Sequence, residues 1–315
     1  MKKLKTLAIC LIGLSAPGWA CDTGGGINAD LHGNRLFPAD NAWNQPIDTK
    51  PIDPNSTTLI NQMGSKVSLH PDFGANAYWV DGNPFGIPYI VVSGTTAKVP
   101  ITFDYNSESD PGPYPIPANA PIEGGANSNG DRHVIVLDQD HWKLYETWSS
   151  YPQPDGSWNA GSGAIFNLTS NALRPAGWTS ADAAGLPILP GLVRYDEVYI
   201  HKAINHAIRF TVAKTRKAYI APARHFASND TSPNLLPMGA RLRLKAGYKI
   251  SNFSAPAQVI LKALKKYGII LADNGSNMYI SGTADARWDD DMLNTLKNVK
   301  NTDFEVIKMG TLITK

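Results

Sequence analysis

The sequence predicts a mainly β fold, β-sandwich-like or jelly-roll-like, with a few peripheral helices and a C-terminal helix-strand unit. Short apolar runs separated by Pro, Gly and Asn recur through most of the chain, which holds 27 Gly and 23 Pro among its 315 residues. Helical periodicity is confined to a few segments beyond about residue 250. So few helices do not suit a doubly wound α/β fold, in which helices cover both faces of the sheet.

The N-terminus has the pattern of a secretory signal peptide over residues 1–20. A lysine-rich start precedes an apolar run from Leu7 to Ala16, which is too short to span a bilayer as a helix. Small residues then favour cleavage before Cys21, so we expect a secreted or periplasmic protein. Lipid anchoring at Cys21 is the alternative, against which stands Gly18, where a lipid-acceptor Cys normally has a large aliphatic residue.

The rest of the chain is expected to form a flexible Gly/Asp/Asn-rich segment at 21–35 and then one β-rich globular domain at 36–315. Loss of Cys10 with the signal peptide leaves one Cys and therefore no intrachain disulfide. The formal net charge is only +2, and the absence of a long basic run argues against nucleic acid as a partner. No later stretch has 18 consecutive apolar residues, so we expect no transmembrane segment.

The elements follow from local patterns. Residues 105–120 carry four prolines and are expected to be extended, whereas residues 150–191 are expected to be a loop-dominated connection of a length that is often functional. Strands are predicted at 87–92, 99–103, 133–138, 143–148, 207–212, 218–220, 241–244 and 304–307, and at 269–272 and 278–281 around a turn at 273–275. Helices are predicted at 256–267, before Gly268, and at 288–296, where the acidic run with three Asp residues in the first turn is expected to cap the helix.

The hairpin at 133–148 yields the most concrete site prediction. If Asp138 pairs with Lys143, then His133, Glu146 and Trp148 share one otherwise apolar face, because side chains alternate along strands. A carboxylate and a histidine on such a face need each other or a ligand, since an unpaired buried charge is costly. Burial would also raise the pKa of Glu146, as a general acid requires. A purely structural pair is the alternative.

Two further clusters lie at predicted strand ends. Glu123 and the run from Asp131 through Arg132 to His133 bring acid, base and guanidinium to a glycine-rich approach to a strand, although a polar turn with a salt bridge is the alternative. Arg224 and His225 follow the strand at 218–220. Earlier in the chain, His206 is expected to be a hydrogen-bonded core histidine, on the opposite strand face from Arg209.

Known cofactor and nucleophile signatures are missing from the sequence. There is no H-E-x-x-H or H-x-H, no nucleotide-binding glycine motif and no G-x-S-x-G, so we expect no metal and no cofactor. The candidate catalytic residues are Glu123, Asp131, His133, Glu146 and His225. The candidate substrate-binding residues are Arg132, Tyr145, Trp148 and Arg224.

Four stretches, which begin at His206, Pro222, Leu261 and Ala272, resemble those of a family of secreted, mostly bacterial proteins. The resemblance covers about residues 120–307 and implies no particular activity.

The composition favours a carbohydrate-active protein. A neutral, turn-rich exported chain with eight Trp residues suits sugar binding, because aromatic rings stack on the apolar faces of sugars. The first hypothesis is a secreted polysaccharide hydrolase or lyase that uses acid, His and Arg residues in a cleft. The alternative is a non-catalytic glycan- or surface-binding protein, which would expose Trp142, Trp148 and Trp158 on a flat face. Substrate and oligomeric state stay open.

Overall fold

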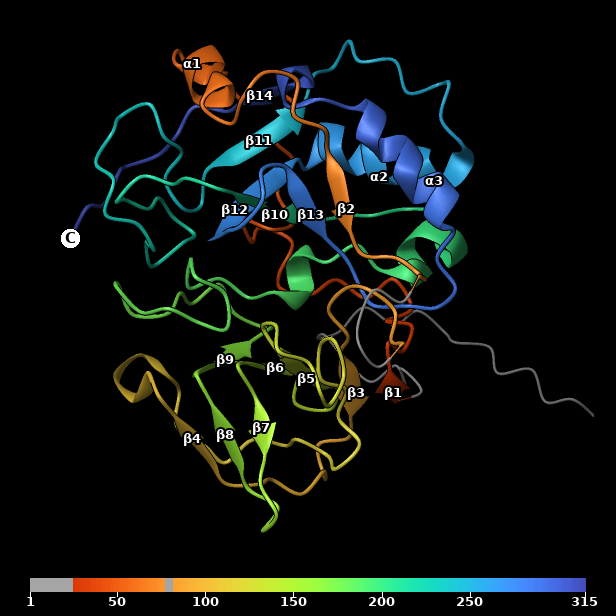
Figure 1. The fold of residues 1–315 in the computed structure, drawn as a ribbon, viewed down its shortest axis with the longest axis vertical. Coiled ribbons are helices and arrows are strands. Elements are labelled where there is room, and N and C mark those ends of the chain that lie inside the picture. The colour runs from red at the N-terminus through yellow and green to blue at the C-terminus, as the bar shows by residue number, and fades with distance from the viewer. Residues whose placement is uncertain (1–24, 77–81) are drawn as a thin grey trace, which may run out of the picture.

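The computed structural model describes residues 25–76 and 82–315, and it is mainly β, with a few short helices (Figure 1). The signal peptide predicted at 1–20 and the proposed lipidation site at Cys21 lie outside these residues. The strands of the described chain form sheets of five, six and three strands in a β-sandwich-like arrangement. No helix of the described residues is long and apolar enough to cross a membrane.

The five-stranded and three-stranded sheets form the lower half of the molecule in Figure 1. The larger one contains, in spatial order, β1 (Gly26–Ile27), β3 (Ile90–Val92), β5 (Val134–Asp138), β6 (Lys143–Trp148) and β9 (Ser162–Asn167). The smaller one contains β4 (Ile101–Phe103), β8 (Trp158–Ala160) and β7 (Tyr151–Pro152). Because side chains alternate, Val134 and Val136 of β5 pack in a core with Trp158, while Ile135 and Leu137 enter the main core.

The six-stranded sheet and the longer helices form the upper half (Figure 1). Its strands, in spatial order, are β14 (Phe304–Val306), β11 (Arg241–Leu244), β12 (Ile269–Asn274), β10 (Ile208–Val212), β13 (Tyr279–Ser281) and β2 (His70–Asp72). The α-helices are α1 (Ser56–Asn61), α2 (Ala255–Lys266) and α3 (Asp290–Thr295). Short 3-10 helices lie at Asn106–Glu108, Leu189–Gly191, Leu296–Asn298 and Asn301–Asp303, and a π-helix lies at Asp196–Ile200.

Local sequence patterns located most of the longer elements. The hairpin has the predicted register, with Asp138 opposite Lys143. The helix α2 ends at Lys266 with Tyr267 as its C-cap, just before Gly268, as predicted. The predicted capping role of the acidic run at the start of α3 is confirmed, because Asp289 accepts a hydrogen bond from the Met292 N–H. Residues 25–35, which were expected to be flexible, include β1, which pairs with β3, and the fully buried Leu31.

Three parts of the fold differ from the prediction. The segment at 218–220 is not a strand and forms only isolated bridges from Tyr219 to Met238 and Ile313. The connection at 150–191, expected to be loop-dominated, contributes strands β7, β8 and β9. Strands β12 and β13 are not paired with each other around the turn at 273–275, because β10 lies between them, parallel to β12 and antiparallel to β13. This insertion is a long-range pairing that no local pattern reports, and it brings β10 side chains next to those of both neighbours.

Gly268 provides a test of the junction between α2 and β12. Its φ is +71°, and a Cβ there would collide with the Leu242 carbonyl oxygen and lie 2.6 Å from Ile47 Cδ1. We expect Gly268→Ala to lower the free energy of unfolding by about 2 kcal/mol or more, since the substitution adds backbone strain and a steric clash. Urea unfolding followed by circular dichroism measures this. Gly247→Ala is the matched control, because Gly247 has open space around it, and equal losses in both variants would contradict the expectation.

Candidate active site

A row of polar side chains crosses one face of the six-stranded sheet, where an apolar surface would be expected. Asp72 of β2 lies opposite Ser281 of β13 in the strand register. Ser281 Oγ in turn accepts a hydrogen bond of 2.7 Å from Arg209 Nη1 of β10. Neighbouring strands thus place a carboxyl, a hydroxyl and a guanidinium side by side, facing the five-stranded sheet and the connection that follows it.

Arg209 is the centre of this row. Its Nε and Nη2 donate to the two carboxylate oxygens of Asp182 at 2.7 and 2.9 Å, and Nη2 lies 3.2 Å from Asp273 Oδ2 of β12. Burial alone would lower the pKa of Arg209, but the charge of Asp182 outweighs it and raises the pKa. The guanidinium is therefore a fixed cation. It joins residues 168–193, which are the connection that follows β9, to the six-stranded sheet.

A cavity of about 380 Å³ opens over this cluster, between the two larger sheets. Trp148 at the end of β6 and Asp182 and Ala183 of the connection form part of its wall, and Asp273 and Asn274 at the end of β12 complete that side. The remaining lining residues are Tyr105, Glu108, Asp131, Ser162, Thr179, Ser180, Ala181, His225 and Ala227. Of the predicted site residues, Asp131, Trp148 and His225 thus reach one cavity.

Two carboxyl groups at this cluster hold protons unusually well. Burial, reinforced by the charge of Asp182, raises the pKa of Asp273 to about 7, although the side chain is still 27% exposed. Burial also raises the pKa of Asp72 to about 6, an effect that Arg209 partly offsets. Near neutral pH, the Asp273 carboxyl on the cavity wall is therefore close to half protonated, the state that a general acid needs.

His225 faces the cavity in a defined tautomer. Its Nδ1 lies 2.8 Å from the Ala183 carbonyl oxygen. A carbonyl can only accept a hydrogen bond, so Nδ1 carries the hydrogen and Nε2 keeps its lone pair when the ring is neutral. The residue lines the cavity, and this nitrogen can therefore accept a proton from water or from a substrate hydroxyl.

His133 is buried behind the cavity, where it forms a charged pair. Its Nδ1 lies 2.6 Å from Glu123 Oε2 and its Nε2 lies 3.0 Å from the Ala181 carbonyl oxygen. Burial by itself would lower the pKa of His133, but the Glu123 carboxylate outweighs it and raises the pKa to about 9. Asp131 completes a group of three residues whose potential ligand atoms lie within 4.8 Å of one another. The three could hold a metal ion only if it displaced the His133 proton.

Glu146 has the predicted position but a different partner. It lies on the same sheet face as Ile135, opposite it in the hairpin, and its side chain is fully buried. The carboxylate accepts hydrogen bonds from the backbone N–H groups of Ile188 and Leu189 at 2.8–3.0 Å, and the residue does not line the cavity. Burial raises its pKa to about 7, against the opposing effect of these two hydrogen bonds. Glu146 thus holds the connection in place.

Three of the predicted substrate-binding residues make structural contacts within the protein instead of lining the cavity. The Arg132 guanidinium is buried and donates to the carbonyl oxygens of Ala126, Ser128 and Ser150. Tyr145 lies on the opposite sheet face and packs edge-on against Tyr114, with ring centroids 5.3 Å apart. Arg224 Nε donates to the Arg174 carbonyl oxygen at 2.7 Å. None of the three lines the cavity.

Sequence reasoning missed Asp72, Asp182 and Asp273, and it placed Arg209 in no site. Asp182 lies in the long connection between predicted strands, and Asp273 was interpreted as the first residue of a turn. Only the unusual length of that connection pointed to function. The expectation for His206 is confirmed, because it is buried and its Nδ1 and Nε2 contact the Ala207 carbonyl oxygen and Glu197.

Glu146→Ala should lower the free energy of unfolding by about 3 kcal/mol, because two buried N–H groups lose their acceptor and each such loss costs about 1–3 kcal/mol. Glu146→Gln keeps an acceptor oxygen and should cost less. The pKa of the folded state, about 7, lies above the ordinary value of 4.5. Glu146 therefore favours folding most below pH 4.5, and this contribution is lost as pH rises through 7. Urea unfolding at pH 5 and pH 7 should show a smaller pH dependence in Glu146→Gln; an Ala variant as stable as the wild type would contradict this role.

Comparison with known proteins identifies no relative of this chain: no family model, curated protein or solved structure matches it. The chemistry of the cavity residues is therefore the basis on which a function can be assigned.

Proposed function

We propose that the cavity is the active site of an exported carbohydrate-active enzyme that hydrolyses a polysaccharide by acid–base catalysis. The observation that carries this proposal is the Asp273 carboxyl, which has a raised pKa and forms part of the cavity wall. Arg209 Nη2 donates a hydrogen bond to Asp273 Oδ2, which orients the Asp273 carboxyl. A carboxyl that keeps its proton near pH 7 can protonate the leaving oxygen of a glycosidic bond.

The same cavity offers a base and a sugar-binding surface. The Nε2 lone pair of His225 and the exposed carboxylate of Asp131 can each take a proton from an attacking water. Trp148 is held by a hydrogen bond of 3.2 Å from its Nε1 to Asp131 Oδ1, and Tyr105 lies beside it at 6.3 Å between ring centroids. Aromatic rings in this arrangement suit the apolar face of a sugar ring.

The charge of the wall favours hydrolysis over elimination. A polysaccharide lyase must neutralise the carboxylate of a uronate, usually with a cation. Among the described residues the cavity is lined by the acidic groups Glu108, Asp131, Asp182 and Asp273, and by no Lys or Arg. Because Asp182 is paired with Arg209 and Asp273 is partly protonated near pH 7, Glu108 and Asp131 supply the negative charge that would repel an anionic sugar. The expected substrate is therefore an uncharged or cationic glycan.

The alternative of a non-catalytic glycan-binding protein has less support. That function would need Trp142, Trp148 and Trp158 on an open face. Trp142 and Trp158 are each only 5% exposed, and they belong to different hydrophobic cores. Trp148 alone reaches the cavity.

Asp273→Asn should reduce the turnover number about 100-fold or more, because general acid catalysis contributes roughly 10²–10⁴-fold. Reducing-sugar release from a panel of neutral and amino-sugar polysaccharides measures the activity. In the wild type it should fall as pH rises through about 7, when Asp273 loses its proton. Asp155→Asn, in an exposed turn, is the matched control and should retain full activity.

The outcomes of this screen separate the alternatives. An ultraviolet-absorbing unsaturated product would indicate elimination and would overturn the hydrolysis mechanism. Folded wild-type protein that binds a glycan without releasing product would favour the binding function instead. Equal activity in Asp273→Asn and the wild type would remove Asp273 from the mechanism.

A further inference from the structure

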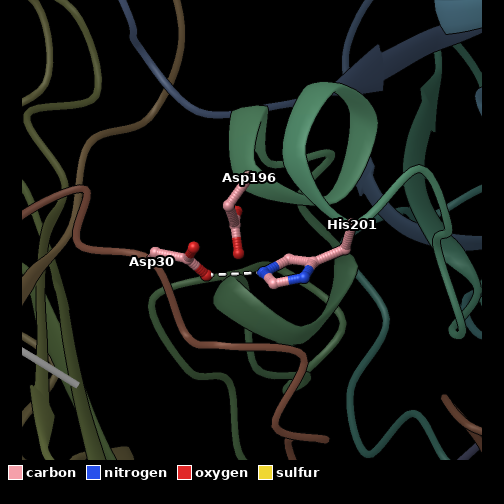
Figure 2. A group of neighbouring side chains, drawn as sticks. All are labelled: Asp30, Asp196 and His201. Atoms are coloured by element: carbon pink, nitrogen blue, oxygen red, sulfur yellow. Dashed lines mark hydrogen bonds and ion pairs between the residues drawn. The ribbon is translucent and has the colours of Figure 1, made fainter. Parts of the chain in front are cut away.

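A second group of titratable side chains lies apart from the active-site cavity. Figure 2 shows Asp30, Asp196 and His201 pointing toward one another, Asp30 from the loop after β1 and the other two from the segment around the π-helix. His201 Nε2 lies 2.7 Å from Asp30 Oδ1. One potential ligand atom from each of the three residues lies within 4.8 Å of the others.

The π-helix is what brings two of these side chains together. The His201 N–H donates to the Asp196 carbonyl oxygen at 2.8 Å, a hydrogen bond that spans five residues. In an α-helix, residues five apart are rotated well away from each other, because one turn takes 3.6 residues. The wider π turn brings them closer to the same side of the helix, and such turns are rare and frequently occur at functional sites.

The negative charge of this region is only partly balanced. Arg194 contacts two carboxylates at once: its Nη2 lies 2.7 Å from Glu197 Oε1, and its Nε lies 3.5 Å from Asp196 Oδ1. Glu197 also contacts His206. Arg194 Nε itself is buried without a hydrogen-bond partner, so its contact with Asp196 is electrostatic only. Asp30 and Asp196 therefore face each other, while Arg194 is shared between Asp196 and Glu197. The other basic side chains nearby are His32, whose Nδ1 lies 3.9 Å from Asp30 Oδ2, and Arg287, which is paired with Asp285.

A hydrated ion can reach this group. A cavity of about 650 Å³ is lined by both Asp30 and Asp196, together with Asn28, Asp285 and Arg287, whereas His201 lines a separate, smaller pocket. The His201 and Asp30 side chains are 29% and 24% exposed. The group that contains Glu123, Asp131 and His133 is less suitable, because His133 is only 3% exposed and both its ring nitrogens already have partners.

We propose that Asp30, Asp196 and His201 form a binding site for a divalent transition-metal ion, with Zn²⁺ or Mn²⁺ the best match. An imidazole nitrogen with two carboxylates is a donor set that these ions accept, whereas Ca²⁺ and Mg²⁺ prefer oxygen ligands alone. Three protein ligands, two of which line an open cavity, leave positions for water or a small ligand. The ion would bridge the loop after β1 and the π-helix.

Isothermal titration of chelator-treated full-length mature protein with Zn²⁺, and separately with Mn²⁺, tests this site. One equivalent of at least one of the ions should bind and should raise the thermal unfolding midpoint. Asp30→Asn and His201→Gln should each weaken this binding at least ten-fold, with circular dichroism confirming that both variants are folded. His141→Gln is the matched control, because His141 contacts the single carboxylate of Asp138 at 2.8 Å, and it should bind like the wild type.

Three results would overturn the proposal. One is folded wild-type protein that binds neither ion. Another is equal affinity in the wild type, Asp30→Asn and His201→Gln. The third is binding that is lost in His133→Gln and kept in His201→Gln, which would assign the ion to the other group. All of these readouts are independent of enzymatic activity, so the failure of the hydrolase proposal would leave this test intact.

Discussion

The buried guanidinium of Arg209 is the charge that joins the six-stranded sheet to the connection at 168–193. A buried cation without a partner would cost several kcal/mol, so the chain must bring carboxylates to it. Asp182 supplies one from the long connection, and Asp273 supplies another from β12. The position of the connection at 168–193 and the floor of the cavity are thus consequences of neutralising one strand side chain.

Three carboxyl groups, those of Asp72, Asp182 and Asp273, lie near the single positive charge of Arg209. One guanidinium is shared by Asp182 and Asp273, and Asp72 stands at the other end of the same polar row. Repulsion and burial together leave Asp273 with a retained proton. Glu146 is also a buried acid, but its carboxyl oxygens accept hydrogen bonds from two backbone N–H groups of the connection and so stabilise that segment. Position relative to the cavity, rather than residue type, separates these two acids.

Much of the fold follows from patterns that are local in sequence. Two apolar runs around a polar turn at 139–142 are enough to predict the hairpin, and pairing Asp138 with Lys143 gives its register. A slip of one residue would exchange the side chains that enter the two cores. The apolar stripe of α2 and the Gly268 that follows it are equally local. The strands β8 and β9 were missed because β8 has only three residues and half of the residues of β9 are Ser, Gly and Asn. Their strand conformation comes from pairing with β4 and β6.

The site was only partly predictable, for the same reason. By itself the sequence predicted the register that puts Glu146 on the core face of the hairpin, and it singled out Asp131, just before β5, and His225, although His225 follows no strand. It could not identify which acid would keep a proton in the cavity, since that depends on β10 lying between β12 and β13 and placing Arg209 beside Asp273. Contacts between segments distant in sequence leave no local periodicity, so only the tertiary structure decided that Asp182 and Asp273 contact the same guanidinium.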